Sequence, residues 1–284
     1  MRRSAAIAVI AGLLLAVAGC GPGTSGQAAV ATSVSPAESP TAAEGSSGSA
    51  DGPKDGDGGV VVDASVVEQS ALRPMQVETD DFWEEILGLA QIPVQVSAPM
   101  KFLYGSETFD CGGVELSAAD QYGPTFCAPE DTIVVSETFM DSIGSSMAMR
   151  ADGTFADQAA EVGLYFLLSH QWGHNILEEM IAAKGADVTL IPSTQLEVTA
   201  DCFAGLAIAG VPRVFAEKDP GAVLSLVSTY GERTTGIAAS PVTREKAIAA
   251  GLARSYDDRA GLAAGVTDCL TGQAPALATA LGVG

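Results

Sequence analysis

The sequence predicts an α+β protein that is predominantly helical, with a small strand region and two disulfides. Apolar side chains recur at helical spacing between residues 155 and 184 and in further stretches after residue 192. Two short stretches, 100–104 and 132–136, are strand-like, and the second is rich in β-branched residues. Four cysteines remain when Cys20 is set aside, and an even number of cysteines in an exported protein indicates disulfides.

Residues 1–19 have the composition of a signal peptide. Arg2 and Arg3 precede an apolar run from residue 5 to residue 18, which is too short to span a bilayer comfortably. The run ends in Val-Ala-Gly-Cys at Cys20, which resembles a bacterial lipobox, whose cysteine becomes the lipid-modified first residue of the mature protein. We therefore expect a lipid anchor on the outward face of a bacterial cell membrane. The alternative is an ordinary secretory signal with an incidental cysteine.

Residues 20–75 are rich in Gly, Ser, Ala, Thr, Pro and Asp and contain no aromatic residue. Such a segment buries too little apolar surface to offset its chain entropy, so we expect a flexible tether. One folded domain would then occupy residues 76–284. The chain has a formal net charge of -21, which would repel the phosphates of nucleic acid over most of the surface. We expect no nucleic-acid partner.

Within the domain, local patterns predict most of the elements. A first helix is expected near residues 80–88, with Trp83 as a core anchor, and strands at 100–104 and 132–136. The central helix should run from residue 155 to residue 184, with Thr154 as its cap and Gly185 after its end. Gly173 inside it suggests that another backbone passes close by or that space is needed there for a substrate. Further helices are expected from about residue 193, and at 219–230, 243–256 and 258–270.

The four remaining cysteines allow three pairings. We expect Cys111 to pair with Cys127, closing a short loop, and Cys202 to pair with Cys269, joining two helical regions. Each disulfide would contribute on the order of 2 to 4 kcal/mol. A zinc-thiolate cluster is the competing interpretation, and it is disfavoured because no Cys-x-x-Cys spacing is present.

Both histidines of the chain, His170 and His174, lie four residues apart on the predicted central helix. This spacing puts two imidazoles on one helix face, where both can reach a single tetrahedral metal ion. An incidental pair of core or surface histidines is the alternative. In zinc proteases the residue after the first histidine is a glutamate that accepts a proton from water. Here it is Gln171, which has no carboxylate. The pattern predicts a metal site and gives a reason to doubt the usual reaction.

A third metal ligand is expected at Glu197, one helical turn before Asp201. Asp201 would accept a hydrogen bond from a ligating imidazole and so fix its tautomer. Both residues also have simpler interpretations. With Thr194 as N-cap, Glu197 would occupy the third position of a capping box, and Asp201 could be a solvated charge on a helix surface.

Three segments together resemble the neutral zinc metallopeptidase family of bacteria, with the resemblance covering about residues 80–270. They are Gly-Pro-Thr-Phe-Cys-Ala-Pro-Glu from residue 123, His-Gln-Trp-Gly-His from residue 170, and Leu-Glu-Val-Thr-Ala-Asp-Cys from residue 196. The family has a His-Glu-x-Gly-His helix and a downstream Glu-x-x-Ala-Asp-Cys element. The resemblance implies a zincin-like domain that holds Zn²⁺ through His170, His174 and Glu197.

The chain departs from the family pattern at two places. Gln171 replaces the general base, a loss worth roughly 100- to 10,000-fold in rate. The stretch before Arg244, where the family looks to carry a further histidine, has none, so a group that would steady an oxyanion is missing. We therefore expect a zinc-binding protein with weak or no peptidase activity that binds a peptide or a partner protein. The alternatives are a working zinc peptidase with an unusual base, and a metal-free interaction domain.

Overall fold

The computed structural model describes residues 62–94, 96, 98–146, 149–150, 154–155, 158–187, 189, 191–211, 221, 223 and 239–283. The predicted signal peptide, Cys20 and the tether up to residue 61 lie outside these residues. So does most of the helix predicted at 219–230. No helix within the described ranges combines the length and the apolar character needed to cross a membrane.

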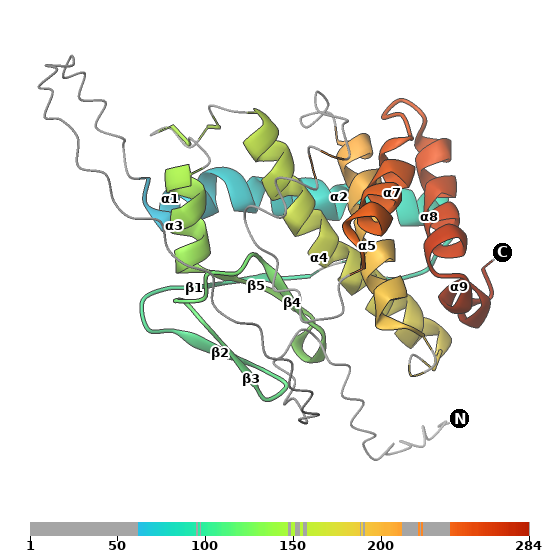
Figure 1. Cartoon of the computed structure of the whole chain (residues 1–284), viewed down its shortest axis with the longest axis horizontal. Helices are drawn as coiled ribbons and strands as arrows, with labels where there is room; N and C mark the ends of the chain where they lie inside the picture. Colours follow the sequence, from blue (N-terminus) through green and yellow to red (C-terminus); the bar gives the residue numbers. More distant parts are fainter. Residues whose placement is uncertain are drawn as a thin grey trace, which may run out of the picture.

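The described chain is predominantly helical, with a small sheet region on one side of the helices (Figure 1). The N-terminal half contains α1 (Ala64–Val67), a π-helical stretch η1 (Glu68–Leu72), α2 (Arg73–Leu89), β1 (Met100–Leu103), β2 (Thr108–Cys111), β3 (Val114–Ser117), β4 (Thr125–Cys127), the 3-10 turn η2 (Ala128–Glu130), β5 (Thr132–Ser136) and α3 (Glu137–Ser146). The C-terminal half contains α4 (Gln158–Lys184), α5 (Ser193–Gly210), α7 (Pro241–Leu252), α8 (Arg259–Gln273) and α9 (Pro275–Leu281).

The first described helices correct the predicted start of the domain. Residues up to 75 were expected to be tether, yet Val67, Ala71, Leu72 and Met75 are buried in the main core. These four residues follow one another at spacings of four, one and three, which puts them on one face of a helix. The overall polarity of the preceding segment conceals this short amphipathic stretch. The folded part therefore begins no later than Val62.

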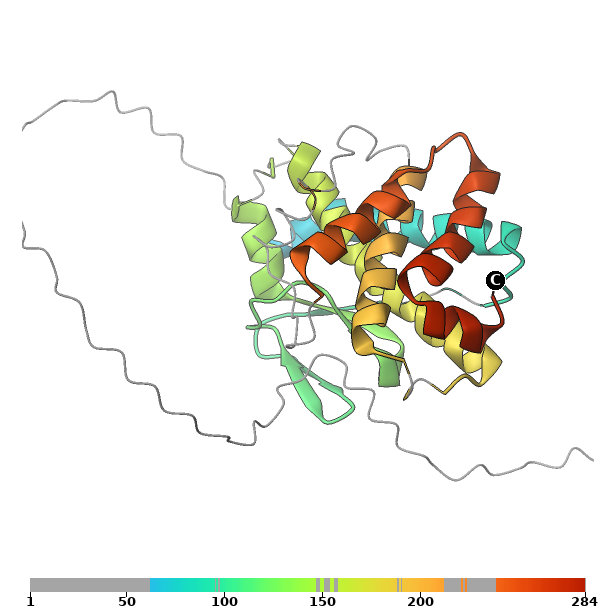
Figure 2. The same ribbon diagram turned by 45° about the vertical axis from the view of Figure 1, so that its right-hand side comes forward.

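The strands form two small sheets. β1 and β5, the two predicted strands, pair in parallel, and β4 pairs antiparallel with β5, which gives the order β1-β5-β4. β2 and β3 form a separate hairpin. β4 is thus an outer strand of its sheet, and Figures 1 and 2 show it next to α4.

The core of the helical part lies between α2, α4, α5 and α8. Trp83 of α2 is fully buried, as predicted for a core anchor, and its ring lies 5.4 Å from that of Phe203 of α5. In Figure 2, α7 crosses α5, against which it packs. Both predicted disulfides are present, Cys111–Cys127 and Cys202–Cys269, and the second joins α5 to α8.

The central helix matches its prediction at one end only. Gly185 follows α4 with φ of +61°, a left-handed conformation that suits glycine and ends the helix. At the other end Phe155 is not helical, because it forms an isolated β-bridge with Met149, and α4 begins at Gln158. Thr154 therefore does not cap the helix directly. The helix predicted at 243–256 ends earlier, at Leu252, and the one predicted at 258–270 continues to Gln273.

Candidate metal centre

His170 and His174 of α4 and Glu197 of α5 converge on one point. One ligand atom from each lies within 4.8 Å of the others. The two imidazole Nε2 atoms are 3.1 Å apart, and the Glu197 carboxylate oxygens lie 3.4 Å from Nε2 of His170 and 3.6 Å from Nε2 of His174. Ligands about 2.1 Å from a tetrahedral metal ion stand roughly 3.4 Å from one another. The three side chains therefore fit a single metal ion without rearrangement.

A close crossing of α4 and α5 brings these side chains together. A Cβ atom on Gly173 would lie 2.8 Å from Cα of Ala200 and 3.0 Å from its carbonyl oxygen. Only glycine permits that approach, as the sequence suggested, because any side chain at residue 173 would push the backbone of α5 away. Gly173 precedes His174, and Ala200 is three residues after Glu197, so the contact lies beside the ligands.

The site is closed on one side and open on the other. His170 is only 2% exposed, whereas the side chains of His174 and Glu197 are each 21% exposed. A metal ion held here would therefore keep a position on the outer side for a further ligand. Burial acts to raise the pKa of Glu197, but the neighbouring imidazoles of His174 and His170 outweigh it and hold the pKa well below its usual range. Glu197 is ionised, as a metal ligand must be.

The capping interpretation of Glu197 is wrong. The N-cap of α5 is Pro192, which makes no side-chain capping bond, and Thr194 lies inside the helix. Glu197 therefore does not occupy the third position of a capping box. Its carboxylate instead points at the two histidines across the helix pair.

Asp201 stands behind His170. Its Oδ1 atom lies 3.0 Å from Nδ1 of His170, and its side chain is completely buried. The interpretation of Asp201 as a solvated surface charge is therefore wrong. Although burial acts to raise the pKa of Asp201, contacts with Arg244 and His170 lower it. The carboxylate is ionised and stands where it can accept the Nδ1 proton, which leaves Nε2 to face the metal position.

Sequence analysis missed Arg244, which reaches Asp201 from α7. Its Nε donates to Oδ2 at 2.8 Å and its Nη2 donates to Oδ1 at 2.7 Å. A signal for its burial was available in the sequence, because Arg244 precedes Ala247, Ile248 and Gly251 at spacings of three, four and seven. Those positions form the buried face of α7.

Gln171, the residue in the general-base position, is buried and bonded. Its Oε1 accepts a hydrogen bond of 2.8 Å from the backbone N–H of Phe126 in β4. Because that N–H can only donate, the carbonyl end of the amide faces β4 and the amino end points elsewhere. The side chain supplies no group that can take a proton from water.

The residues on either side brace the same helix. The indole Nε1 of Trp172 donates to Asp80 of α2 at 2.8 Å, and Asn175 donates to Asp131, after η2, at 2.5 Å. Together with Gln171, these contacts fix the segment that carries both histidines against three other parts of the chain. The ligating face of α4 is thus preorganised.

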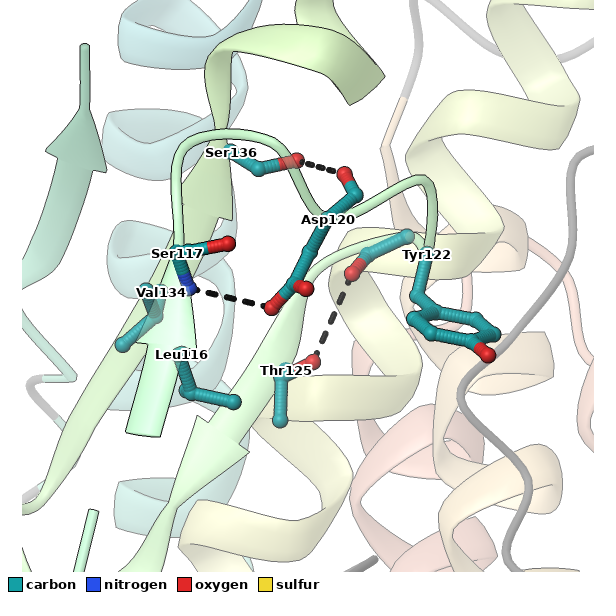
Figure 3. A pocket seen from close by; sticks show the side chains of 8 residues that line it. Leu116, Ser117, Asp120, Tyr122, Thr125, Val134 and Ser136 are labelled. Atoms are coloured by element: carbon teal, nitrogen blue, oxygen red, sulfur yellow. Dashed lines mark hydrogen bonds between the residues drawn. The ribbon is translucent and has the colours of Figure 1, made fainter. Parts of the chain in front are cut away.

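A small hollow beside β4 is separate from this centre (Figure 3). The carboxylate of Asp120 accepts from the backbone N–H of Ser117 at 3.0 Å, and its carbonyl accepts from the Ser136 hydroxyl at 2.6 Å. The hollow measures about 10 Å³, room for roughly one water molecule. It therefore suits no small-molecule ligand. Its lining residues are Leu116, Ser117, Asp120, Tyr122, Gly123, Thr125, Val134 and Ser136.

No protein-family model, curated protein or solved structure matches this chain.

Proposed function

We propose that this chain is a zinc-binding protein with a zincin-like fold, related to neutral zinc metallopeptidases, whose peptidase activity is weak or lost. In this proposal the site binds a peptide or a partner protein. The observation that carries it is the convergence of His170, His174 and Glu197 beside a residue that cannot act as a base. With this combination the chain can bind a metal ion but lacks, at Gln171, the base that peptide hydrolysis uses.

Zinc is the ion that this donor set favours. Two imidazoles and one carboxylate with an open outer position form the usual ligand set of a catalytic zinc site. Harder ions such as Ca²⁺ and Mg²⁺ prefer oxygen ligands. When bound, zinc would act as a Lewis acid that polarises a carbonyl group and activates water. The protein side chains would hold it, with His170 oriented by Asp201.

Weak hydrolysis is proposed because Gln171 supplies no base and Glu178, an acidic residue further along the same helix, is too far away to replace it. Burial raises the pKa of Glu178, as do the charges of Glu179 and Asp131, so Glu178 has the chemistry of a proton acceptor. It follows Gln171 by seven residues, however, which is roughly 10 Å along a helix. At that distance it cannot take a proton from a group between His170 and His174.

The place of action is proposed from the sequence. The apolar run before Cys20 and the polar segment after it support a lipid-anchored protein on the outer face of a bacterial membrane. Labelling with a fatty-acid analogue would test this, and Cys20→Ser should abolish the label.

Metal analysis of the purified protein tests the proposed function. We expect one zinc ion per chain, lost in His170→Ala. A protein that binds no zinc under saturating conditions would support the metal-free interaction domain instead.

Peptidase assays then distinguish a pseudoenzyme from a working peptidase. We expect the zinc-loaded native protein to cleave peptides far more slowly than the Gln171→Glu variant. Equal activity of the two proteins would show that the native chain is an enzyme with an unusual base.

A further inference from the structure

The guanidinium group of Arg244 grips both oxygens of the Asp201 carboxylate. Its two hydrogen bonds, of 2.8 Å and 2.7 Å, form a bidentate pair between α7 and α5. The side chain of Arg244 is 10% exposed and that of Asp201 is not exposed at all. Bidentate pairs of this kind are strong and fix the orientation of the carboxylate. Asp201 therefore cannot rotate freely.

Two glycines set the distance over which Arg244 must reach. A Cβ atom on Gly251 of α7 would lie 2.2 Å from the carbonyl oxygen of Cys202. On the facing helix, a Cβ atom on Gly205 would lie 2.5 Å from the carbonyl oxygen of Ile248. The backbones of α5 and α7 are thus in direct contact. Arg244, seven residues before Gly251 on α7, reaches Asp201 beside this contact.

The gripped carboxylate is the one that faces the metal centre. Oδ1 of Asp201 accepts the hydrogen bond from Nη2 of Arg244 and also lies 3.0 Å from Nδ1 of His170. A fully buried carboxylate without a cation would be an uncompensated charge, which protein interiors tolerate poorly. Arg244 supplies that cation and keeps the oxygen 3.0 Å from Nδ1 of the imidazole.

We propose that Arg244 is a positioning residue of the metal centre, which orients His170 through Asp201 and so sets the affinity for zinc. The inference rests on the zinc binding proposed above. The centre then depends on three helices: α4 supplies two ligands, α5 supplies the third ligand and Asp201, and α7 supplies the clamp. Lysine cannot replace arginine fully here, because one ammonium group cannot match the two-pronged geometry.

The test compares Arg244→Lys and Arg244→Met with the matched control Arg254→Met in the full chain. Arg254 is half-buried and pairs with the exposed Asp268, so its replacement removes the same charge without touching Asp201. Zinc affinity is measured by competition with a chelator, and cobalt-loaded protein gives a visible spectrum that reports ligand geometry. Circular dichroism of the metal-free proteins shows which variants fold.

We expect Arg244→Met to bind zinc about 10- to 100-fold more weakly and to alter the cobalt spectrum, with a smaller loss in Arg244→Lys. Arg254→Met should leave both measurements unchanged. If the native protein binds zinc and both Arg244 variants bind it equally well with an unchanged spectrum, this inference is wrong while the proposed function stands. A native protein that binds no zinc would instead overturn the proposed function.

Arg244→Met could fail to fold, and a double-mutant comparison covers that case. Asp201→Asn is combined with Arg244→Lys, which keeps the positive charge. If Arg244 acts through Asp201, the lysine substitution should have little further effect on zinc affinity once Asp201 is replaced. If the double variant loses zinc affinity by the product of the factors lost in the two single variants, Arg244 acts by another route and the inference is overturned.

Discussion

The side-chain oxygen of Gln171 accepts a hydrogen bond from the backbone N–H of Phe126 at 2.8 Å, which ties α4, the helix that carries both histidines, to the outer strand β4. Because β4 lies at the edge of its sheet, the N–H of Phe126 can bond to α4 rather than to β5. The residue that would serve as a base in a peptidase therefore has a structural part in this chain. It holds the strand beside the metal centre.

Gln171→Glu should keep this contact and add a base. A carboxylate can accept the Phe126 N–H with one oxygen and leave the other free. We expect peptide hydrolysis by the zinc-loaded variant to exceed that of the native protein by about 100-fold or more. Cleavage of a quenched fluorescent peptide library measures the gain. Gln171→Met is the control, which should bind zinc, show no gain and unfold about 1 to 3 kcal/mol more easily, because the Phe126 N–H loses its acceptor.

Gly173→Ala should loosen the crossing of α4 and α5. The added Cβ would lie 2.8 Å from Cα of Ala200, so the helices must separate. We expect a loss of about 1 to 3 kcal/mol in the free energy of unfolding, together with weaker zinc binding. Gly88→Ala is a matched control, because it also replaces a helix glycine and the added Cβ meets nothing within 4 Å. Urea titration should show that the control is about 0.5 to 1 kcal/mol more stable. Equal effects of the two substitutions would contradict the close-crossing account.

Asp80 should make stability depend on pH. Burial and, to a smaller extent, the charge of Asp81 raise the pKa of Asp80 from its ordinary 3.8 to about 6, against the hydrogen bond from Trp172. The folded chain therefore holds this proton more tightly than the unfolded chain. The stabilisation is complete below about pH 4 and is lost as the pH rises through about 6.

Asp80→Asn tests this dependence. It keeps an oxygen for Trp172 and removes the ionisation, so we expect a gain of about 1 kcal/mol at pH 7.5, allowing for the partial exposure of this side chain. The gain should vanish near pH 4. Asp81→Asn, at an exposed position, should change stability by less than about 0.5 kcal/mol. Urea titrations at the two pH values measure both, and a gain for Asp80→Asn that is independent of pH would refute the account.

The two disulfides should differ in their contributions. Cys202 and Cys269 are 67 residues apart, whereas Cys111 and Cys127 are 16 apart. Closing the longer loop removes more entropy from the unfolded chain, so replacing Cys202 and Cys269 by Ala should cost roughly 4 kcal/mol, against roughly 3 for the other pair. Thermal unfolding of the two double variants in metal-free buffer gives the order. If removal of Cys111–Cys127 lowers the stability more than removal of Cys202–Cys269, the entropy of the unfolded chain does not determine how much each disulfide stabilises the protein.

Much of the helical framework was accessible from local patterns. The spacing of His170 and His174, the stop at Gly185 and the strand at 132–136 all depend on residues within a few positions of one another. The start of the domain was misjudged because the apolar residues from Val67 to Met75 follow a long polar segment. The start of α4 was misjudged because Phe155 pairs with Met149 instead of continuing the helix.

The sequence alone determined that two imidazoles share one helix face, that a glutamine follows the first of them, and that an acid lies on a later helix. Only the tertiary structure decided that Glu197 meets those imidazoles, that Arg244 grips Asp201 from 43 residues away, and that Gln171 bonds Phe126 from 45 residues away. The physical reason is the range of the interactions. Helical periodicity follows from neighbours along the chain, whereas contacts between separate elements depend on how closely their backbones pack, and here glycines set that distance.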